Sequence, residues 1–530
     1  MAEPACPWVL GVRSLGALLA MLLAGCATTA EPSLEADLLL RSGTVYPGGA
    51  APFIGDIAVR GDRILAVGKN LRVTARRNID ATGLIVAPGF IDPHAHMESW
   101  LTADDPQRRL VAPFLLQGVT TVFVGNDGFG PVDVKPLLAS ADNKPVGINY
   151  AAFTGFGSIR SAVIGPARRA PTAAELAQQQ ALVHQAMCDG ALGLSTGLFY
   201  APQSFAETAE VVALARVAGE LGGHYDTHLR DESNYTVGLA ASVEEAITIA
   251  REARIPVHIS HIKALGVDVH GRAPAIIDKV GRARAEGLAI TADQYPWQAS
   301  GTSLVAALVP LWAQDGGRAA LLKRLDDPAL TGRLRSEMAE NLRRRGGADS
   351  LLVAQGRWKG QRLSQIAAAM ATDPVSAAIA AIREADAATI SFNMSPADIA
   401  AFMTQPWVVT GSDASTGHPR TYGSFAEKHA VYVRDGKLLT LREFIDRSST
   451  LTADIFRLKD RGRLRPGAFA DVAVFDPERF AARATYERPE LTAEGMRYVL
   501  VNGALAVDDG RLTGVAAGRA LAKEPAAGCQ

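Results

Sequence analysis

The sequence is best understood from one stretch, Gly89-Phe90-Ile91-Asp92-Pro93-His94-Ala95-His96, which follows an apolar run. Together they predict a buried strand over 84–96 that ends in a His-x-His pair. Side chains two residues apart along a strand point the same way, so His94 and His96 present their imidazoles together at the carboxyl end. Imidazole is a common ligand of divalent metal ions. The pair alone is a weak signal, and a metal site needs further ligands from elsewhere in the chain.

Downstream of this stretch, predicted strands alternate with predicted helices. The further strand candidates are 119–126, 146–155, 191–198, 223–230, 256–263, 288–296 and 407–414. Eight strands, most of them followed by a helical pattern, are the signature of an α/β fold of the (β/α)8 TIM-barrel type. The alternative is a doubly wound open sheet, but no Gly-x-Gly-x-x-Gly follows the first strand.

Two parts of the chain depart from this alternation. Residues 297–406 form a long, mostly helical stretch after the seventh barrel strand, and an insertion there lies at the catalytic face and is a candidate lid. Short alternating segments in 36–83 return in 461–515, which predicts that both chain ends pair into one small β-sandwich domain. The barrel would then span 84–460, and 516–530 would be a tail.

The balance of charged residues argues against some classes of binding partner. The chain has 530 residues, with 54 Lys and Arg against 55 Asp and Glu, a formal net charge of −1. A balanced charge gives no support for a nucleic-acid partner or for attraction to an acidic membrane surface. The length allows more than one structural unit.

The amino-terminal segment is typical of an exported protein. The apolar run 15–23 is too short to be a permanent membrane span. It ends in Leu23-Ala24-Gly25-Cys26, which resembles a bacterial lipobox, and Ala27 resembles the residue that directs lipoproteins to the outer membrane. The sequence therefore predicts a signal peptide over 1–25, a tether over 26–35, and a lipid-anchored protein on the periplasmic side of the cell envelope. A plain secretory signal with a coincidental Cys is the alternative.

The four cysteines predict no disulfide framework. Cys6 leaves with the signal peptide, Cys26 is lipidated, Cys188 lies in a helical pattern and Cys529 lies in the tail. No Cys-x-x-Cys occurs, so a cysteine metal site is not expected either.

The carboxyl ends of the other predicted strands supply the missing ligands. They carry Asp127 (second strand), His228 (fifth), His261 (sixth) and Asp413 (eighth). Catalytic groups of such barrels gather at these ends, and His with carboxylate suits a divalent ion such as zinc. Singly, each residue is better explained as a hydrogen-bonded core residue, but together with His94 and His96 they predict a metal site. The remaining strand and helix histidines, His184, His224, His258 and His270, are not assigned to it.

Several sequence motifs resemble those of a known protein family. They are Gly89-Phe90-Ile91-Asp92-x-His94-x-His96, Gly193-Leu194-Ser195-Thr196-Gly197, Thr227-His228-x-Arg230-Asp231-Glu232, Ile259-Ser260-His261-x-Lys263, Asp293-x-Tyr295-Pro296, Gly411-Ser412-Asp413 and His418-Pro419-Arg420. The chain resembles the amidohydrolase superfamily and, within it, the N-acyl-D-amino-acid deacylase (D-aminoacylase) family, from about residue 36 to 515.

The resemblance implies a zinc-dependent hydrolase of N-acyl-amino acids, N-acyl-D-amino acids in particular. It implies that His228 and His261 hold a tightly bound zinc ion, while His94, His96 and Asp413 face a second, weaker metal position. Metal-activated water would attack the amide, with Asp413 as general base and then general acid.

The substrate implied is a small molecule with a free carboxylate. Lys263, Tyr295 and Arg420 match family positions that hold the substrate's α-carboxylate. Two cations and a phenol make a suitable anion clamp, and Arg can grip a carboxylate with two hydrogen bonds.

Asp127 departs from the family pattern, which usually has Cys at this position. A carboxylate keeps the negative charge but is a harder ligand with two oxygens that can bridge two ions. No Lys occurs between Lys144 and Lys263, which leaves no fourth-strand carboxylated Lys as a bridge. Asp127 is therefore the best candidate for a bridging ligand.

Two alternative functions remain open. One is a dipeptidase-like or cyclic-amide amidohydrolase, although the missing fourth-strand Lys and the presence of His418-Pro419-Arg420 weigh against cyclic amides. The other is a surface-tethered binding lipoprotein without catalysis, against which the intact Asp413 argues.

Overall fold

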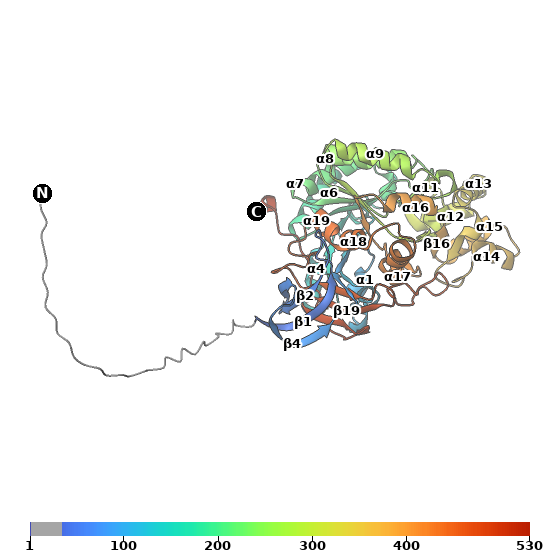
Figure 1. Cartoon of the computed structure of the whole chain (residues 1–530). Helices are drawn as coiled ribbons and strands as arrows, with labels where there is room; N and C mark the ends of the chain where they lie inside the picture. Colours follow the sequence, from blue (N-terminus) through green and yellow to red (C-terminus); the bar gives the residue numbers. More distant parts are fainter. Residues whose placement is uncertain (2–33, 530) are drawn as a thin grey trace, which may run out of the picture.

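A computed structural model describes Met1 and residues 34–529 (Figure 1). The predicted signal peptide, Cys26 and most of the predicted tether lie outside the described residues. A strand begins at Leu34, so the last two residues of the predicted tether belong to that strand. Within the described part of the chain, no single helix is long and apolar enough to cross a membrane. One pair bent by 94°, Leu363–Ala369 with Pro374–Glu384, would reach that length and composition together.

Parallel strands form the centre of the molecule. They are β6 (Phe90–Asp92), β7 (Val119–Val124), β8 (Asn149–Ala152), β9 (Thr154–Gly155), β10 (Gly193–Gly197), β11 (His224–His228), β12 (Val257–Ile259), β13 (Ile290–Gln294) and β17 (Val408–Thr410). Hydrogen bonding runs β6-β7-β8 and β9-β10-β11-β12-β13-β17. The N–H of Asp413 donates to the His94 carbonyl (2.9 Å) and that of His96 to Ala414 (3.1 Å), so the last strand's end meets the first. The protein is an α/β barrel with additional domains.

Helices surround these strands. The helices and helical turns up to β13 are α1 (Glu98–Leu101), α2 (Pro106–Arg109), α3 (Ala112–Leu115), α4 (Lys135–Asn143), α5 (Phe156–Val163), α6 (Ala173–Cys188), η1 (Gln203–Phe205), α7 (Thr208–Glu220), α8 (Leu239–Ala253), η2 (Val267–Val269) and α9 (Ala273–Ala285). After β17 follow α17 (Arg420–Glu427), η4 (Lys428–Asp435), α18 (Leu441–Ile445), η5 (Asp446–Thr450) and α19 (Leu451–Ile455). Strand side chains are buried on both faces, as parallel sheets covered by helices require.

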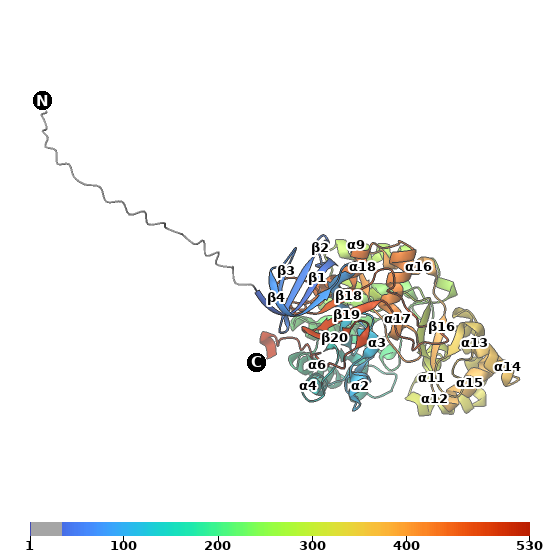
Figure 2. The same ribbon diagram turned by 60° about the horizontal axis from the view of Figure 1, so that its bottom comes forward.

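The two chain ends meet in one sheet, visible in Figure 2 as blue strands beside red ones. Its strands are β1 (Leu34–Val45), β2 (Phe53–Arg60), β3 (Arg63–Gly68), β4 (Val73–Asp80), β5 (Ile85–Pro88), β18 (Val472–Phe475), β19 (Met496–Val501), β20 (Ala504–Asp508) and β21 (Arg511–Leu512). Antiparallel pairing of β18 with β5 joins the ends, and hydrogen bonds connect all nine strands into one continuous sheet.

The strand predicted over 84–96 is in fact two strands. β5 belongs to the terminal sheet and β6 to the barrel, and Gly89 separates them. A Cβ on Gly89 would lie 2.2 Å from Thr120 Oγ1, so only glycine fits where the chain crosses between the domains. The barrel therefore begins after residue 88 and not at 84.

The insertion between β13 and β17 contains a sheet that the sequence did not predict. Its strands β14 (Ala299–Ser303), β16 (Ala388–Phe392) and β15 (Leu351–Val353) pair antiparallel in that order. Its helical segments are α10 (Leu304–Leu308), α11 (Leu311–Gln314), α12 (Gly317–Asp326), α13 (Pro328–Arg344), η3 (Ala348–Ser350), α14 (Leu363–Ala369), α15 (Pro374–Glu384) and α16 (Pro396–Met403). Most of them share an apolar core of their own, separate from that of the barrel. In Figure 1 the helices α11 to α15 form a yellow group to one side of the barrel.

The carboxyl-terminal residues run along the barrel rather than away from it. The N–H of Gly518 donates to Val146 (2.8 Å), that of Leu521 to Tyr150 (2.7 Å), and η6 (Ala527–Cys529) ends the described chain. Cys529 forms a disulfide with Cys188, at the end of α6. The expectation of no disulfide was wrong, because the two cysteines are 341 residues apart and only the fold brings them together.

Candidate metal and substrate site

His94 and His96 lie immediately after β6 and not within a strand. Asp92, the last residue of β6, accepts the backbone N–H of His94 (3.1 Å) and of Ser412 (3.0 Å) through Oδ1. This carboxylate fixes the turn that carries the two histidines against the end of β17. His94 is fully buried, whereas the His96 side chain is 26% exposed.

Asp127 follows β7 in a left-handed turn. Its φ is +57°, and the next residue, Gly128, is also left-handed at +72°. The Gln203 side chain donates to the Asp127 carbonyl (2.9 Å) and accepts the N–H of Gly197 (2.7 Å), while Ser195 Oγ accepts the N–H of Gly128 (3.1 Å). Hydrogen bonds with Ser195 of β10 and Gln203 of η1 therefore fix the turn that carries the Asp127 carboxylate.

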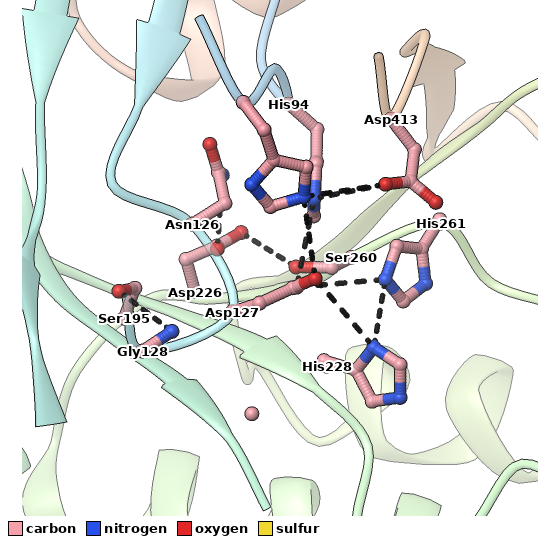
Figure 3. Close-up of polar contacts among 12 residues, drawn as sticks. His94, Asn126, Asp127, Gly128, Ser195, Asp226, His228, Ser260, His261 and Asp413 are labelled. Carbon is pink, nitrogen blue, oxygen red and sulfur yellow. Dashed lines mark hydrogen bonds and ion pairs between the residues drawn. The ribbon is translucent and has the colours of Figure 1, made fainter. Parts of the chain in front are cut away.

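The six predicted ligands converge on one another, and Figure 3 labels five of them. Asp127 Oδ1 lies 3.5 Å from both His94 Nε2 and His261 Nε2. Asp127 Oδ2 lies 3.5 Å from His96 Nε2 and 3.8 Å from His228 Nδ1. On the other side, Asp413 Oδ1 lies 3.6 Å from His94 Nε2 and 3.4 Å from His96 Nε2.

The donor set fits a divalent metal ion. Both His94 nitrogens and Asp127 Oδ1 are buried without a hydrogen-bond partner among the described residues, which is costly for polar atoms. Separations of 3.4–3.8 Å between nitrogen and oxygen are too long for good hydrogen bonds. Two ligands bound at about 2.1 Å to a tetrahedral ion lie about 3.4 Å apart. His94, Asp127, His261 and Asp413 are close enough to share one ion.

Electrostatics favours ionised carboxylates at this site. Burial raises the pKa of Asp127, but the charges of His94 and His261 outweigh it and hold that pKa well below its ordinary value. Burial likewise raises the pKa of Asp413, and Arg420 and His261 reverse the effect and lower it. Both carboxylates are therefore available as anionic ligands.

The three residues predicted to clamp a carboxylate lie together beside this cluster. Arg420 Nη1 is 2.6 Å from Asp413 Oδ2, and the Arg420 guanidinium lies 5.2 Å from the centre of the Tyr295 ring. Lys263 Nζ lies 5.7 Å from the centre of the same ring. All three side chains are buried and line a cavity of about 660 Å³ that also contains Asp127 and the histidines, apart from His94. The insertion supplies much of the opposite wall.

Glu232 was not predicted as a site residue. It lies in the loop after β11, lines the same cavity, and accepts a hydrogen bond from Lys263 Nζ (2.6 Å). Its Oε1 is also 3.1 Å from His261 Nδ1. The sequence feature that could have indicated Glu232 is the motif Thr227-His228-x-Arg230-Asp231-Glu232, in which Glu232 follows His228 by four residues.

Comparison with known proteins decides the family. A sequence model described as "Amidohydrolase family" matches residues 77–507. The chain belongs to the amidohydrolase family. This amidohydrolase is 33% identical over 518 residues to the D-aminoacylase of Alcaligenes xylosoxydans xylosoxydans, covering 92% of this chain and 98% of that one. An N-acyl-D-aspartate deacylase of the same organism is also 33% identical, with 92% and 95% covered.

Solved structures agree with this assignment. The N-acyl-D-glutamate deacylase from Bordetella bronchiseptica, complexed with zinc and a phosphonate inhibitor, superposes with a TM-score of 0.79 at 32% identity, covering 92% of this amidohydrolase and 100% of that chain. A D-aminoacylase structure whose subject is its binuclear metal centre gives 0.78 at 31% identity over the same shares. The predicted family and the prediction of a hydrolase are confirmed.

Proposed function

We propose that this amidohydrolase hydrolyses the amide bond of N-acyl-amino acids, N-acyl-D-amino acids in particular, to a carboxylate and a free amino acid. The observation that carries the proposal is the position of Arg420. Arg420 is 2% exposed, and its Nε has no hydrogen-bond partner among the described residues. Its guanidinium contacts Asp413, one of the predicted metal ligands. A buried cation with an unused donor beside a hydrolytic centre suits a substrate with a free carboxylate. Relatives named D-aminoacylase and N-acyl-D-aspartate deacylase support the same substrate class.

The metal would be zinc, held at two positions that share Asp127. His228 and His261 would hold the tighter ion, and His94, His96 and Asp413 would face the weaker one. Zinc lowers the pKa of water from 15.7 to about 7 and polarises a carbonyl group. Asp127 would be the ligand common to both positions, because its carboxylate oxygens lie 3.5–3.8 Å from ring nitrogens of all four histidines.

Asp413 would act as general base and then as general acid. Its side chain projects from the end of β17 into the cluster, where Arg420 holds Oδ2 and leaves Oδ1 facing His94 and His96. Asp413 would take a proton from the attacking water and return it to the leaving nitrogen. Arg420, Lys263 and Tyr295 would hold the α-carboxylate and so place the amide over the cluster.

A substrate panel tests this function. Purified zinc-loaded protein is incubated with N-acetyl-D- and L-amino acids, dipeptides and cyclic amides, and released amine is measured. We expect release from the N-acetyl-D-amino acids above all. Turnover restricted to dipeptides or cyclic amides contradicts the substrate assignment, and no turnover at all contradicts catalysis.

The role of Asp413 is tested separately. Asp413→Asn keeps the shape of the side chain but removes the base, so we expect kcat to fall by about 10²–10⁴-fold with the fold retained. A kcat equal to that of the wild type rejects the role. Far-ultraviolet circular dichroism serves as the folding control.

We also propose that the protein is exported and anchored by lipid at Cys26 on the periplasmic side of the outer membrane. The Cys188–Cys529 disulfide supports export, since disulfides persist in oxidising compartments. Labelling with radioactive palmitate in cells should mark the wild type and not Cys26→Ser. Equal labelling of both, or of neither, contradicts the anchor.

A further inference from the structure

Glu232 is a buried carboxylate on a loop that is itself tightly held. Its side chain is 6% exposed. Its backbone carbonyl accepts the N–H of Leu265 (2.9 Å), and Asp231 before it accepts the N–H groups of Ser233 (2.9 Å), Thr236 (2.6 Å) and Gly238 (3.0 Å). These bonds fix the direction in which the Glu232 side chain leaves the loop.

The two oxygens of Glu232 face the outer nitrogens of two metal-site histidines. Oε1 lies 3.1 Å from His261 Nδ1, and Oε2 lies 3.7 Å from His228 Nε2. On each ring the opposite nitrogen faces Asp127, at 3.5 Å for His261 Nε2 and 3.8 Å for His228 Nδ1. Both imidazoles therefore lie between Asp127 on the inner side and Glu232 on the outer side.

This arrangement matters for metal binding because imidazole has two nitrogens. A ring that binds a metal through one nitrogen carries its proton on the other, and an acceptor for that proton sets the tautomer and the ring's orientation. Carboxylates commonly serve as that acceptor, and removing them typically weakens metal binding 10–100-fold. Here Glu232 lies within hydrogen-bond distance of the His261 ring (3.1 Å), whereas it lies 3.7 Å from the His228 ring and acts on it through its negative charge.

Glu232 also holds a residue of the proposed substrate clamp. Lys263 Nζ donates to Oε1 at 2.6 Å, the same oxygen that faces His261. Lys263 in turn lies beside the Tyr295 ring, with 5.7 Å from Nζ to the ring centre. The position of the clamp lysine thus depends on the carboxylate that faces the metal-site rings.

We propose that Glu232 is a positioning residue that orients His228 and His261 toward the metal and sets Lys263 for the substrate's carboxylate. Its second role rests on the proposed function, whereas its first does not. Glu232, His228 and His261 are themselves close enough to share an ion. Lys263 Nζ, however, lies 2.6 Å from both Glu232 Oε1 and His261 Nδ1, and a cation in that place opposes a metal ion there.

Zinc binding tests the first role without using catalysis. Metal-free wild type, Glu232→Gln and Glu245→Gln are titrated with Zn²⁺ against a chromophoric chelator. Glu245 is the matched control, because its side chain is also nearly buried (10% exposed) and also pairs with a cation, Arg230, at 2.7 Å. Among the described residues, Glu245 has no hydrogen bond or ion pair with a predicted metal ligand. We expect the zinc Kd of Glu232→Gln to rise about 10–100-fold and that of Glu245→Gln to stay within about twofold. An unchanged Kd in Glu232→Gln, or an equal rise in both variants, overturns the proposal.

Kinetics tests the second role. With zinc saturating, Glu232→Gln should raise KM for an N-acetyl-D-amino acid with a smaller change in kcat, and Lys263→Met should raise KM likewise. An unchanged KM in Glu232→Gln overturns the link to Lys263. If Glu232→Gln does not fold, Glu232→Asp keeps the charge but withdraws the oxygens by one methylene, and a zinc Kd equal to that of the wild type then overturns the proposal. If the wild type binds zinc but hydrolyses no N-acyl-amino acid, the proposed function fails while the zinc comparison still decides the role of Glu232.

Discussion

Arg420→Met removes the cation that we assign to the substrate's α-carboxylate. In the structure the guanidinium is 2% exposed, Nη1 pairs with Asp413 at 2.6 Å, and Nη2 donates to Ser415 Oγ at 2.9 Å. Nε has no hydrogen-bond partner among the described residues. A substrate carboxylate can therefore accept from Nε and from the second hydrogen of Nη2, which lies on the same edge of the guanidinium.

The size of the loss follows from these two donors. A hydrogen bond to a charged group contributes about 1.5–3 kcal/mol, and truncating one partner of a buried charged pair costs about 2–5 kcal/mol. Taking about 3–4 kcal/mol for the pair, and about 1.36 kcal/mol for each factor of ten, kcat/KM should fall about 10²–10³-fold.

The assay must separate the clamp from the effect on Asp413, which also loses a partner. Wild type and Arg420→Met are compared on an N-acetyl-D-amino acid and on its carboxamide, which has no negative charge. Damage to Asp413 lowers kcat/KM for both substrates, whereas loss of the clamp lowers it for the acid alone. Arg461→Met is the control, since Arg461 is another buried arginine (5% exposed) paired with an aspartate, Asp471, which directly precedes β18 of the terminal sheet. Equal losses for acid and amide, or a loss for the acid below about fivefold, refute the assignment of Arg420.

Three further outcomes are expected. Asp127→Ala should bind less zinc per chain than the wild type by elemental analysis, and equal metal content excludes Asp127 as a ligand. Cys529→Ser opens the disulfide to Cys188 and should lower the free energy of unfolding by about 2–5 kcal/mol without changing the zinc content, and an unchanged unfolding midpoint contradicts a stabilising role. Burial and the charge of Arg447 lower the pKa of Lys428 from 10.5 in the unfolded chain to about 7 in the folded protein. Between pH 7 and pH 10.5 the unfolded chain therefore binds more protons than the folded protein, and the free energy of unfolding rises with pH. Lys428→Met should remove that rise and stabilise the protein by at most about 5 kcal/mol at and below pH 7, which thermal unfolding at pH 7 and pH 9.5 measures.

The candidate ligands could be found from sequence because of barrel geometry. His94, Asp127, His261 and Asp413 each follow a short buried strand and His228 ends one, and the carboxyl ends of parallel barrel strands meet at one face. Strand prediction alone therefore brings these residues together. Glu232 does not follow a strand directly, and its place depends on a loop folded around Asp231, which no periodic pattern encodes.

Other features could not be predicted for equally physical reasons. The Cys188–Cys529 bond depends on the path of residues 516–529 along the barrel, which sequence spacing does not report. The strand Ala299–Ser303 has the sequence Ala-Ser-Gly-Thr-Ser, in which apolar and polar residues do not alternate. The sequence pattern therefore did not predict the sheet in the insertion. The apolar run 84–91 contains a Pro88-Gly89 step, but a turn signal alone does not show that the two halves of the run join different sheets.

The crossing at Gly89 has a practical consequence for protein engineering. The terminal sheet passes directly into the barrel strand that precedes His94, with a single residue between β5 and β6. Because β5 is held by β18 from the other end of the chain, a truncated chain that starts at residue 90 would leave an edge of β18 unpaired where the first barrel strand begins. The terminal sheet and the catalytic barrel should therefore be cloned, grafted or recombined as one unit.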